Sequence, residues 1–140
     1  LNSLYTITSN IERISDHAIN IAEYSNMIRE KKIVFSKFAQ AEITEMQKVC
    51  DQMFGILVNK QEDVVRWHEH IAAMEQKIDD LTERYRNNMY ERIQSGICSD
   101  EGSILFSEML TDFERIGDHA TNIAETVIYS ITGKINYKFE

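Results

Sequence analysis

Acidic residues recur at helical spacing in two nearly identical segments of this chain. The first, ERISDHAINIAE, spans residues 12–23, and the second, ERIGDHATNIAE, spans residues 114–125. In each copy a glutamate is followed four residues later by an aspartate, which places the two carboxylates one turn apart on a helix. Hard di- and trivalent cations bind oxygen ligands of this kind. The chemistry predicted by these segments is metal binding.

Each repeated segment has a polar side and an apolar side when it is folded as a helix. The polar side consists of Glu12, Asp16, Asn20 and Glu23 in the first copy, and of Glu114, Asp118, Asn122 and Glu125 in the second. Acids one turn apart repel each other by a few tenths of a kcal/mol. A solvent-facing helix gains nothing from repeating them, although an ordinary solvated amphipathic helix remains the alternative interpretation.

A complete metal site needs ligands from a second helix. Glu75 and Asp79 repeat the four-residue spacing in another predicted helix. If that helix runs antiparallel to the last one, its two acids face Glu114 and Asp118. Four carboxylates brought together repel one another unless a cation joins them. We therefore predict that these four residues are metal ligands.

The first copy offers only half of such a site. Glu12 and Asp16 have no acidic partner helix within the chain, and we expect that helix upstream of Leu1, because the chain begins inside a helical pattern. They are therefore predicted as a half-site. The residues predicted to support the ligands from outside are Asn20, Glu23, His119, Asn122 and Glu125.

The histidines do not suggest an enzyme. His17 and His119 lie about 100° around the helix from the motif aspartates, at the border of the two sides, so direct ligation is the weaker interpretation. The histidines of the WHEH sequence at 67–70 are two residues apart and do not share a helix face; we interpret Trp67 as a core or interface aromatic. Di-iron bundles use Glu-x-x-His pairs. No glutamate stands three residues before any of the four histidines of this chain. No phosphate-binding loop or nucleophile motif is present either, so we predict no catalysis.

Composition limits the fold and the partners. The chain has no proline, five glycines and a formal charge of −8. So few chain-breaking residues favour long helices, and the negative charge argues against nucleic-acid binding, which depends on Lys and Arg. Cys50 and Cys98 lack metal-binding spacing and predict two small buried residues in a reduced, cytosolic protein. No apolar run approaches the roughly 18–20 residues that span a bilayer.

Apolar residues spaced three and four apart predict four helices, at about 4–30, 36–60, 62–94 and 100–132. Gly96 and Gly133 stand where helices end, and Ser99 stands where one begins. The short connections make sequential helices antiparallel, so the predicted fold is an all-α bundle of four long helices. The predicted core seam of the second and third helices consists of Ile43, Met46, Cys50, Met53 and Leu57, and of Ile71, Met74, Ile78, Leu81, Tyr85 and Met89.

The doubled motif resembles the signature helix of the PhoU family, whose members contain two repeats of a three-helix bundle. The resemblance implies that residues 33–140 form one complete repeat and that residues 1–32 are the last helix of a preceding one, packed together as one domain. In this family Glu/Asp-x-x-x-Asp pairs hold multinuclear clusters of iron or zinc. That role carries over to Glu114 and Asp118, to Glu75 and Asp79 by spacing, and to the half-site of the first copy.

The segment at 77–98, which leads into the second motif, is most similar to the C-terminal PhoU-like domain of bacterial type II Na⁺/phosphate cotransporters. This implies a regulatory domain in phosphate uptake, cytosolic and tethered at the inner membrane through a larger protein. Its partner would be the transmembrane part of the transporter or a signalling protein. The alternative is an interaction module of a free-standing regulator without metal. Because the first helix lacks its own bundle, its apolar side should pack on the other three helices or on a second copy in a homodimer.

Overall fold

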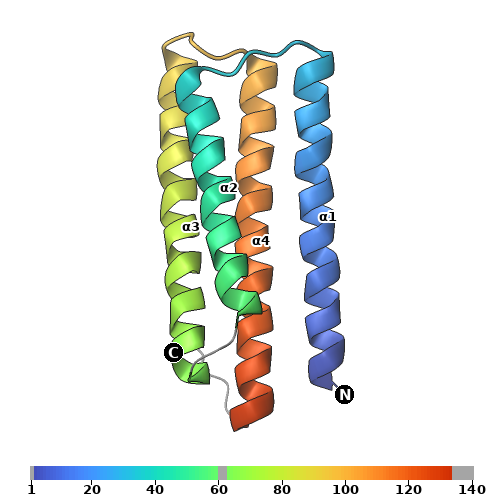
Figure 1. Ribbon diagram of the computed structural model, residues 1–140. Helices are drawn as coiled ribbons and strands as arrows, with labels where there is room; N and C mark the ends of the chain where they lie inside the picture. Colours follow the sequence, from blue (N-terminus) through green and yellow to red (C-terminus); the bar gives the residue numbers. More distant parts are fainter. Residues whose placement is uncertain (1, 60–62, 134–140) are drawn as a thin grey trace.

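The computed structural model describes residues 2–59 and 63–133, which form four long helices (Figure 1). They are α1 (Asn2–Glu30), α2 (Lys37–Val58), α3 (Val64–Gln94) and α4 (Asp100–Thr132), and no strand occurs in these two ranges. Each helix runs antiparallel to the one before it. This confirms the predicted all-α bundle. The expected ends of the second and third helices near residues 60–62 fall outside the described residues.

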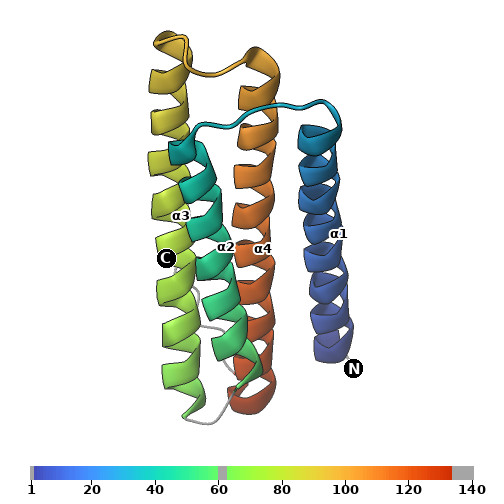
Figure 2. The same ribbon diagram turned by 45° about the horizontal axis from the view of Figure 1, so that its top comes forward.

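Three of the helices form a bundle, and the fourth is attached to one side of it. Helices α2, α3 and α4 pack against one another around a core that includes Met46, Ile71 and Leu110, all with 0% exposure. Helix α1 packs against α4 and, within the described ranges, against no other helix (Figure 2). The predicted boundary between residues 32 and 33 lies in the connection from α1 to α2. The acidic side of α4 is therefore held between α3 and α1.

Side chains and glycines fix the helix ends. Ser99 Oγ accepts a hydrogen bond from the backbone N–H of Gly102 at 3.0 Å, which caps the start of α4. Gly96 and Gly133 follow α3 and α4 with positive φ values of 71° and 70°. These left-handed positions are where a glycine ends a helix at least cost. All three positions were predicted correctly from the sequence.

The predicted core seam of α2 and α3 is confirmed, since its members are buried or packed against the core. One of the two cysteines differs from the prediction that both are buried. Cys50 is 4% exposed, but Cys98 lies only half-buried in the connection before α4, where it has solvent on one side. Trp67 is a core aromatic, as predicted, and its Nε1 donates to the carbonyl of Ile56 at 2.9 Å.

The apolar side of α1 packs within the chain only in part. Ile14 and Ile21 lie against the core, whereas Ile11 is 55% exposed and Ala18 is exposed as well. One neighbouring helix covers one strip of a helix surface, so the remaining apolar residues of α1 face solvent. The expectation that the other three helices cover this side is thus met along one strip only.

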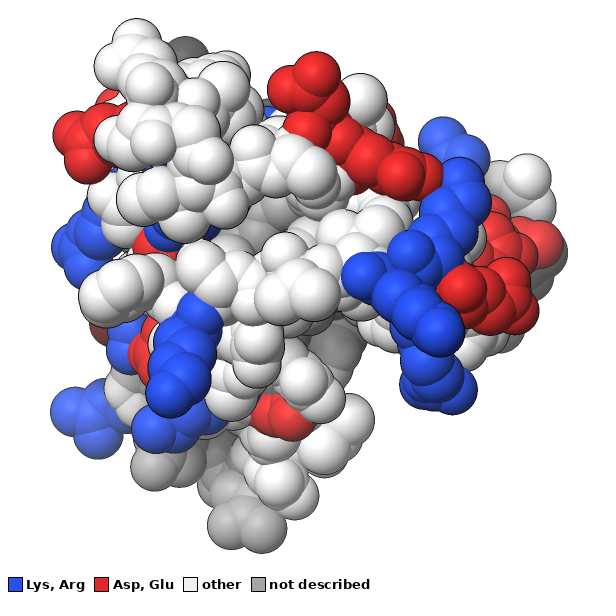
Figure 3. Space-filling model, turned by 90° about the horizontal axis from the view of Figure 1, so that it is seen from above, with Lys and Arg blue, Asp and Glu red and all other residues white. Residues whose placement is uncertain are grey.

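The end of the bundle that carries the α1–α2 and α3–α4 connections has an uncharged middle (Figure 3). Lys and Arg side chains gather at one side of this end, over α1, where Lys31 Nζ lies 2.8 Å from Glu101 Oε1. Large apolar side chains are exposed in and near the connections, with Val34 at 87%, Phe38 at 77% and Ile97 at 63%. Clustered exposed apolar residues are a common feature of interaction surfaces. None of the helices in the described ranges is long and apolar enough to cross a membrane.

Candidate functional site

The structure brings the four predicted acidic residues together across the α3–α4 contact. Because the two helices are antiparallel, Glu75 comes to lie beside Asp118, to which it is hydrogen-bonded, and Asp79 lies beside Glu114. We call these four residues the acidic quartet. All four are half-buried. The pairing follows the predicted register, while the role of these side chains as metal ligands stays a prediction.

Burial and mutual repulsion make two members of the acidic quartet, Asp79 and Asp118, costly to ionise. The pKa of Asp118 is raised, first by burial and then by Asp79, against opposing effects of Arg115, His119 and the hydrogen bond from Glu75. The pKa of Asp79 is raised by burial and then by Glu114 and Asp80. A raised pKa means that the folded protein favours the neutral carboxyl group. A bound cation would favour the ionised form instead.

The donor set suits a hard cation, but its side chains do not converge on one point. Within residues 2–59 and 63–133, no three His, Cys, Asp or Glu side chains are placed to hold a metal ion together. The carboxyl groups of Glu75 and Asp118 are instead joined by a hydrogen bond. Metal binding here would require the side chains to turn toward a common centre.

Gly117 allows the close helix approach that forms the acidic quartet. It is buried between Glu114 and Asp118, and a Cβ added to it would lie 3.1 Å from Cδ1 of Ile78 on α3. That is closer than ordinary van der Waals contact, so a larger residue requires the Ile78 side chain to move by a few tenths of an ångström. The corresponding Ser15 of the first copy is exposed and meets no such neighbour.

The histidines and asparagines of both motif copies lie in the contact between α1 and α4. His17 Nδ1 is 2.7 Å from Asp112 Oδ1, and Asn20 Nδ2 donates to the same oxygen at 3.2 Å. Because the acceptor is a carboxylate, Nδ1 of His17 carries the hydrogen. Asn20 was predicted to support the metal ligands of its own copy, and the structure places it in this interhelical contact.

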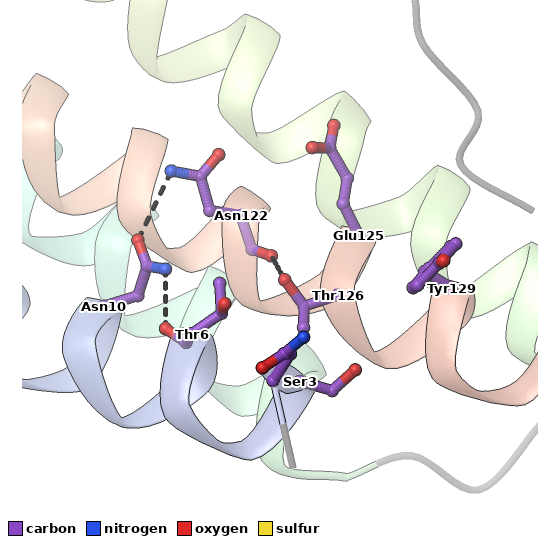
Figure 4. Close-up of a pocket in the computed structure, with 8 residues that line it drawn as sticks. Ser3, Thr6, Asn10, Asn122, Glu125, Thr126 and Tyr129 are labelled. Atoms are coloured by element: carbon purple, nitrogen blue, oxygen red, sulfur yellow. Dashed lines mark hydrogen bonds between the residues drawn. The ribbon is translucent and has the colours of Figure 1, made fainter.

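The second copy makes the corresponding contact in the opposite direction. His119 Nδ1 is 2.9 Å from Asn10 Oδ1, and Asn122 Nδ2 donates to that oxygen at 3.3 Å (Figure 4). Asn10 in turn donates from Nδ2 to the carbonyl of Thr6 at 2.9 Å. His119 and Asn122, which were predicted to support the metal ligands, therefore bind α1. His119 is also next to Asp118 in the chain and influences its pKa.

The two histidine rings stack on each other at the centre of this contact. Their centroids are 5.6 Å apart and their planes differ by 21°. The pKa of His119 is lowered, first by burial and then by the neighbouring His17 and Arg13, so its ring is neutral at pH 7. Asn10 and Asp112, which receive these hydrogen bonds, were missed from the sequence. The available signal was that each stands two residues before a motif glutamate.

The remaining predicted residues lie apart from the acidic quartet. Glu12 and Asp16 are exposed on α1, and the one helix that α1 contacts in the described part of the chain is α4. Glu23 is exposed on the same helix. Glu125 lines a polar cavity of about 370 Å³ between α1 and α4, together with Asn10, Asn122 and several hydroxyl-bearing residues (Figure 4). The first copy therefore stays a predicted half-site.

Comparison with known proteins shows which family the chain belongs to. The PhoU domain model matches residues 43–127, which cover most of α2, all of α3 and most of α4. The chain belongs to the PhoU domain family. It is 31% identical, over 94% of its length, to the phosphate-specific transport system accessory protein PhoU homolog 1 of Thermotoga maritima. This confirms the resemblance that the doubled motif predicted.

PhoU homologs of two other organisms are also similar to this PhoU-family chain. It is 27% identical to that of Synechocystis sp. over 96% of its length, and 28% identical to that of Zymomonas mobilis over 91%. The matches cover 56%, 58% and 53% of the three relatives, so the chain spans about half the length of these proteins. No solved structure matches it. All three relatives are named accessory proteins, and the predicted likeness to a cotransporter domain stays a prediction.

Proposed function

We propose that this chain is a regulatory interaction module of a phosphate transport system, with no catalytic activity of its own. The observation that carries the proposal is the PhoU family match across α2, α3 and α4. The relatives are named as accessory proteins of phosphate-specific transport, which supports a regulatory role beside a transporter. The parent protein is then a free-standing regulator or, as the segment at 77–98 suggests, the cytosolic tail of a transporter.

The exposed apolar side chains at one end of the bundle are the proposed contact for the partner. Val34 and Ile97 are 87% and 63% exposed there, in an uncharged area (Figure 3). Apolar residues left in solvent stabilise a complex when a partner covers them. The partner is a transmembrane phosphate transporter or a signalling protein that reports on it.

Phosphate uptake by cells that carry the intact parent protein tests this proposal. Deleting the segment at 33–140 should change the uptake of radiolabelled phosphate at high external phosphate, because the regulatory contact is lost. The double substitution Val34→Glu/Ile97→Glu should reproduce the change, whereas Tyr129→Glu, on an exposed residue at the opposite end, should not. Uptake that is identical in all strains at every phosphate concentration would contradict the proposal.

Metal binding at the acidic quartet is the second candidate function. It is supported by four half-buried acids in one contact and by the raised pKa values of Asp79 and Asp118. A di- or trivalent ion, iron or zinc by family resemblance, would supply positive charge that offsets this repulsion. The chain would contribute Glu75 and Asp79 from α3, and Glu114 and Asp118 from α4.

Elemental analysis of natively purified protein tests the metal site. The substitution Asp79→Asn/Asp118→Asn should remove bound metal, because it takes away two of the four charged ligands. The matched control is Glu12→Gln/Asp16→Asn, which changes acids of the same motif on the exposed side of α1. Equal metal content in the wild-type protein and the Asp79→Asn/Asp118→Asn variant would show that any metal is held elsewhere.

A further inference from the structure

Arg86 reaches from α3 to α4 and is held there by two hydroxyl groups. Its Nη1 donates to Ser107 Oγ at 2.8 Å, and its Nη2 donates to Thr111 Oγ1 at 2.6 Å. Ser107 and Thr111 are one turn apart on α4, so the two arms of the guanidinium group bind successive turns of one helix. The group is thereby fixed in position and orientation across the contact between α3 and α4.

The charge of Arg86 has no carboxylate partner among residues 2–59 and 63–133. The side chain is half-buried, and within the described ranges it takes part in no ion pair shorter than 4.0 Å. The buried Arg92, by contrast, pairs with Glu42 at 2.7 Å. A charge that is partly removed from water and left unpaired is costly, and a bound anion would offset that cost.

The groups around Arg86 supply hydrogen-bond donors. A guanidinium group has five N–H donors, and the two bonds to α4 leave three unused. Thr111 directs its hydroxyl hydrogen to the carbonyl of Ser107 at 3.2 Å. The hydroxyl hydrogen of Ser107 itself is used in no hydrogen bond within the described ranges. Several donors around one fixed positive charge suit an oxyanion, whose oxygens are all acceptors.

Arg86 and the acidic quartet lie along the same contact between α3 and α4. The pair of Arg86 and Ser107 continues the antiparallel register in which Glu75 lies beside Asp118. Thr111 precedes Glu114 by three residues, about 4.5 Å along the helix axis. We propose that Arg86, Ser107 and Thr111 form a binding site for a tetrahedral oxyanion, and that inorganic phosphate is its ligand. The choice of phosphate among oxyanions rests on the proposed function, but the site itself does not require a metal.

The test is a titration of metal-free protein with sodium phosphate, followed by backbone amide chemical shifts and by melting temperature. Phosphate should shift the amide signals around Arg86 and around 107–111 and should raise the melting temperature. Arg86→Gln should weaken binding about tenfold or more, because a charge-assisted contact of about 1.5–3 kcal/mol is lost. Arg86→Lys should weaken it less, since the charge stays while the two-armed geometry is lost.

The control is Arg84→Gln, which removes an exposed arginine that lines a groove between α2 and α3. It should leave phosphate binding unchanged. A similar response to sulfate supports the oxyanion site. An equal response to chloride at the same ionic strength would indicate an adventitious ion only and would overturn the proposal.

The experiment also separates this site from a purely structural role of Arg86. If Arg86 only joins α3 to α4, Arg86→Gln lowers the melting temperature while tens of millimolar phosphate shift no amide in the wild-type protein. That result would overturn the proposal. The titration uses metal-free protein, so it reports on the phosphate site alone. Elemental analysis reports on the metal site, and failure of one proposal is thereby distinguished from failure of the other.

Discussion

The two copies of the motif helix have nearly the same sequence but very different surroundings. On α4, Phe113 is 6% exposed and Ala120 is 0% exposed. The corresponding residues on α1 are Ile11, at 55%, and Ala18, which is exposed. Helix α4 has α1, α2 and α3 around it, whereas α1 contacts α4 alone among the described helices. The comparison shows that periodicity marks which side of a helix can be buried, while the neighbours decide how much of it is.

The two positions at which the motif copies differ mark where these surroundings differ. Gly117 and Thr121 of α4 are buried, and Thr121 Oγ1 donates to the carbonyl of Gly117 at 2.9 Å. Ser15 and Ile19, their counterparts on α1, are exposed. A small residue was therefore needed only in the copy that packs closely against α3.

Truncating the same isoleucine in each copy should give the largest difference. Ile116→Ala should lower the free energy of unfolding by about 2–5 kcal/mol. The Ile116 side chain is only 5% exposed, so its removal leaves a cavity in the core. Ile14→Ala should cost clearly less, since Ile14 is only half-buried. Urea unfolding followed by circular dichroism measures both. Equal losses would mean that the two copies are equally packed in solution.

Exchanging the residues that distinguish the copies should give the next largest effect. Gly117→Ser should destabilise the protein by about 1–3 kcal/mol, as overpacking does, because its Cβ would meet Ile78. Ser15→Gly should cost about 0.5 kcal/mol or less, which is the difference in helix propensity. The measurement is again urea unfolding, and a neutral Gly117→Ser would show that α3 and α4 can separate locally without loss.

Removing the acceptor of each histidine should test the contact between the copies. Asp112→Ala leaves His17 and Asn20 without their carboxylate and should cost about 1.5–3 kcal/mol, the range for bonds to charged groups. Asn10→Ala removes a neutral acceptor and should cost about 0.5–1.5 kcal/mol. Thermal unfolding at one pH provides the comparison. A larger loss of stability in Asn10→Ala than in Asp112→Ala would show that the contact with Asn10, and not the contact with Asp112, is the stronger one.

Neutralising one aspartate in each copy should give the smallest effect and a pH signature. The pKa of Asp118 is raised in the folded protein, so its contribution to stability is present at low pH and is lost as pH rises through the folded pKa. In metal-free protein, Asp118→Asn should therefore be more stable than wild type at pH 7, by a few tenths of a kcal/mol. The gain should vanish as the pH falls below the ordinary aspartate pKa of 3.8.

The control for this prediction is Asp16→Asn, because Asp16 is exposed on α1. Its stability relative to wild type should not change over the same pH range. A gain of stability in both variants, or a gain for Asp118→Asn that is larger at low pH, would contradict the assigned origin of the raised pKa.

Much of this molecule follows from local sequence patterns. The helices, their caps and the pairing of Glu75 and Asp79 with α4 depend on spacings within one or two helices. The contact of Asp112 with His17 joins residues on helices at opposite ends of the chain. Periodicity gives the side of a helix that is polar, but it does not tell which distant helix approaches that side. For the same reason Asn20 and His119 were assigned to the metal ligands beside them in sequence.

The stacked histidines have a consequence for the origin of the chain. Every hydrogen bond from α1 to Asp112 has a counterpart from α4 to Asn10, with the two helices exchanging roles. This exchange is the property of an isologous contact, which ordinarily joins two identical subunits. A single-copy ancestor of the helix would have carried a surface complementary to itself. Within one chain the same contact is internal, and its two acceptors, Asn10 and Asp112, differ in chemistry.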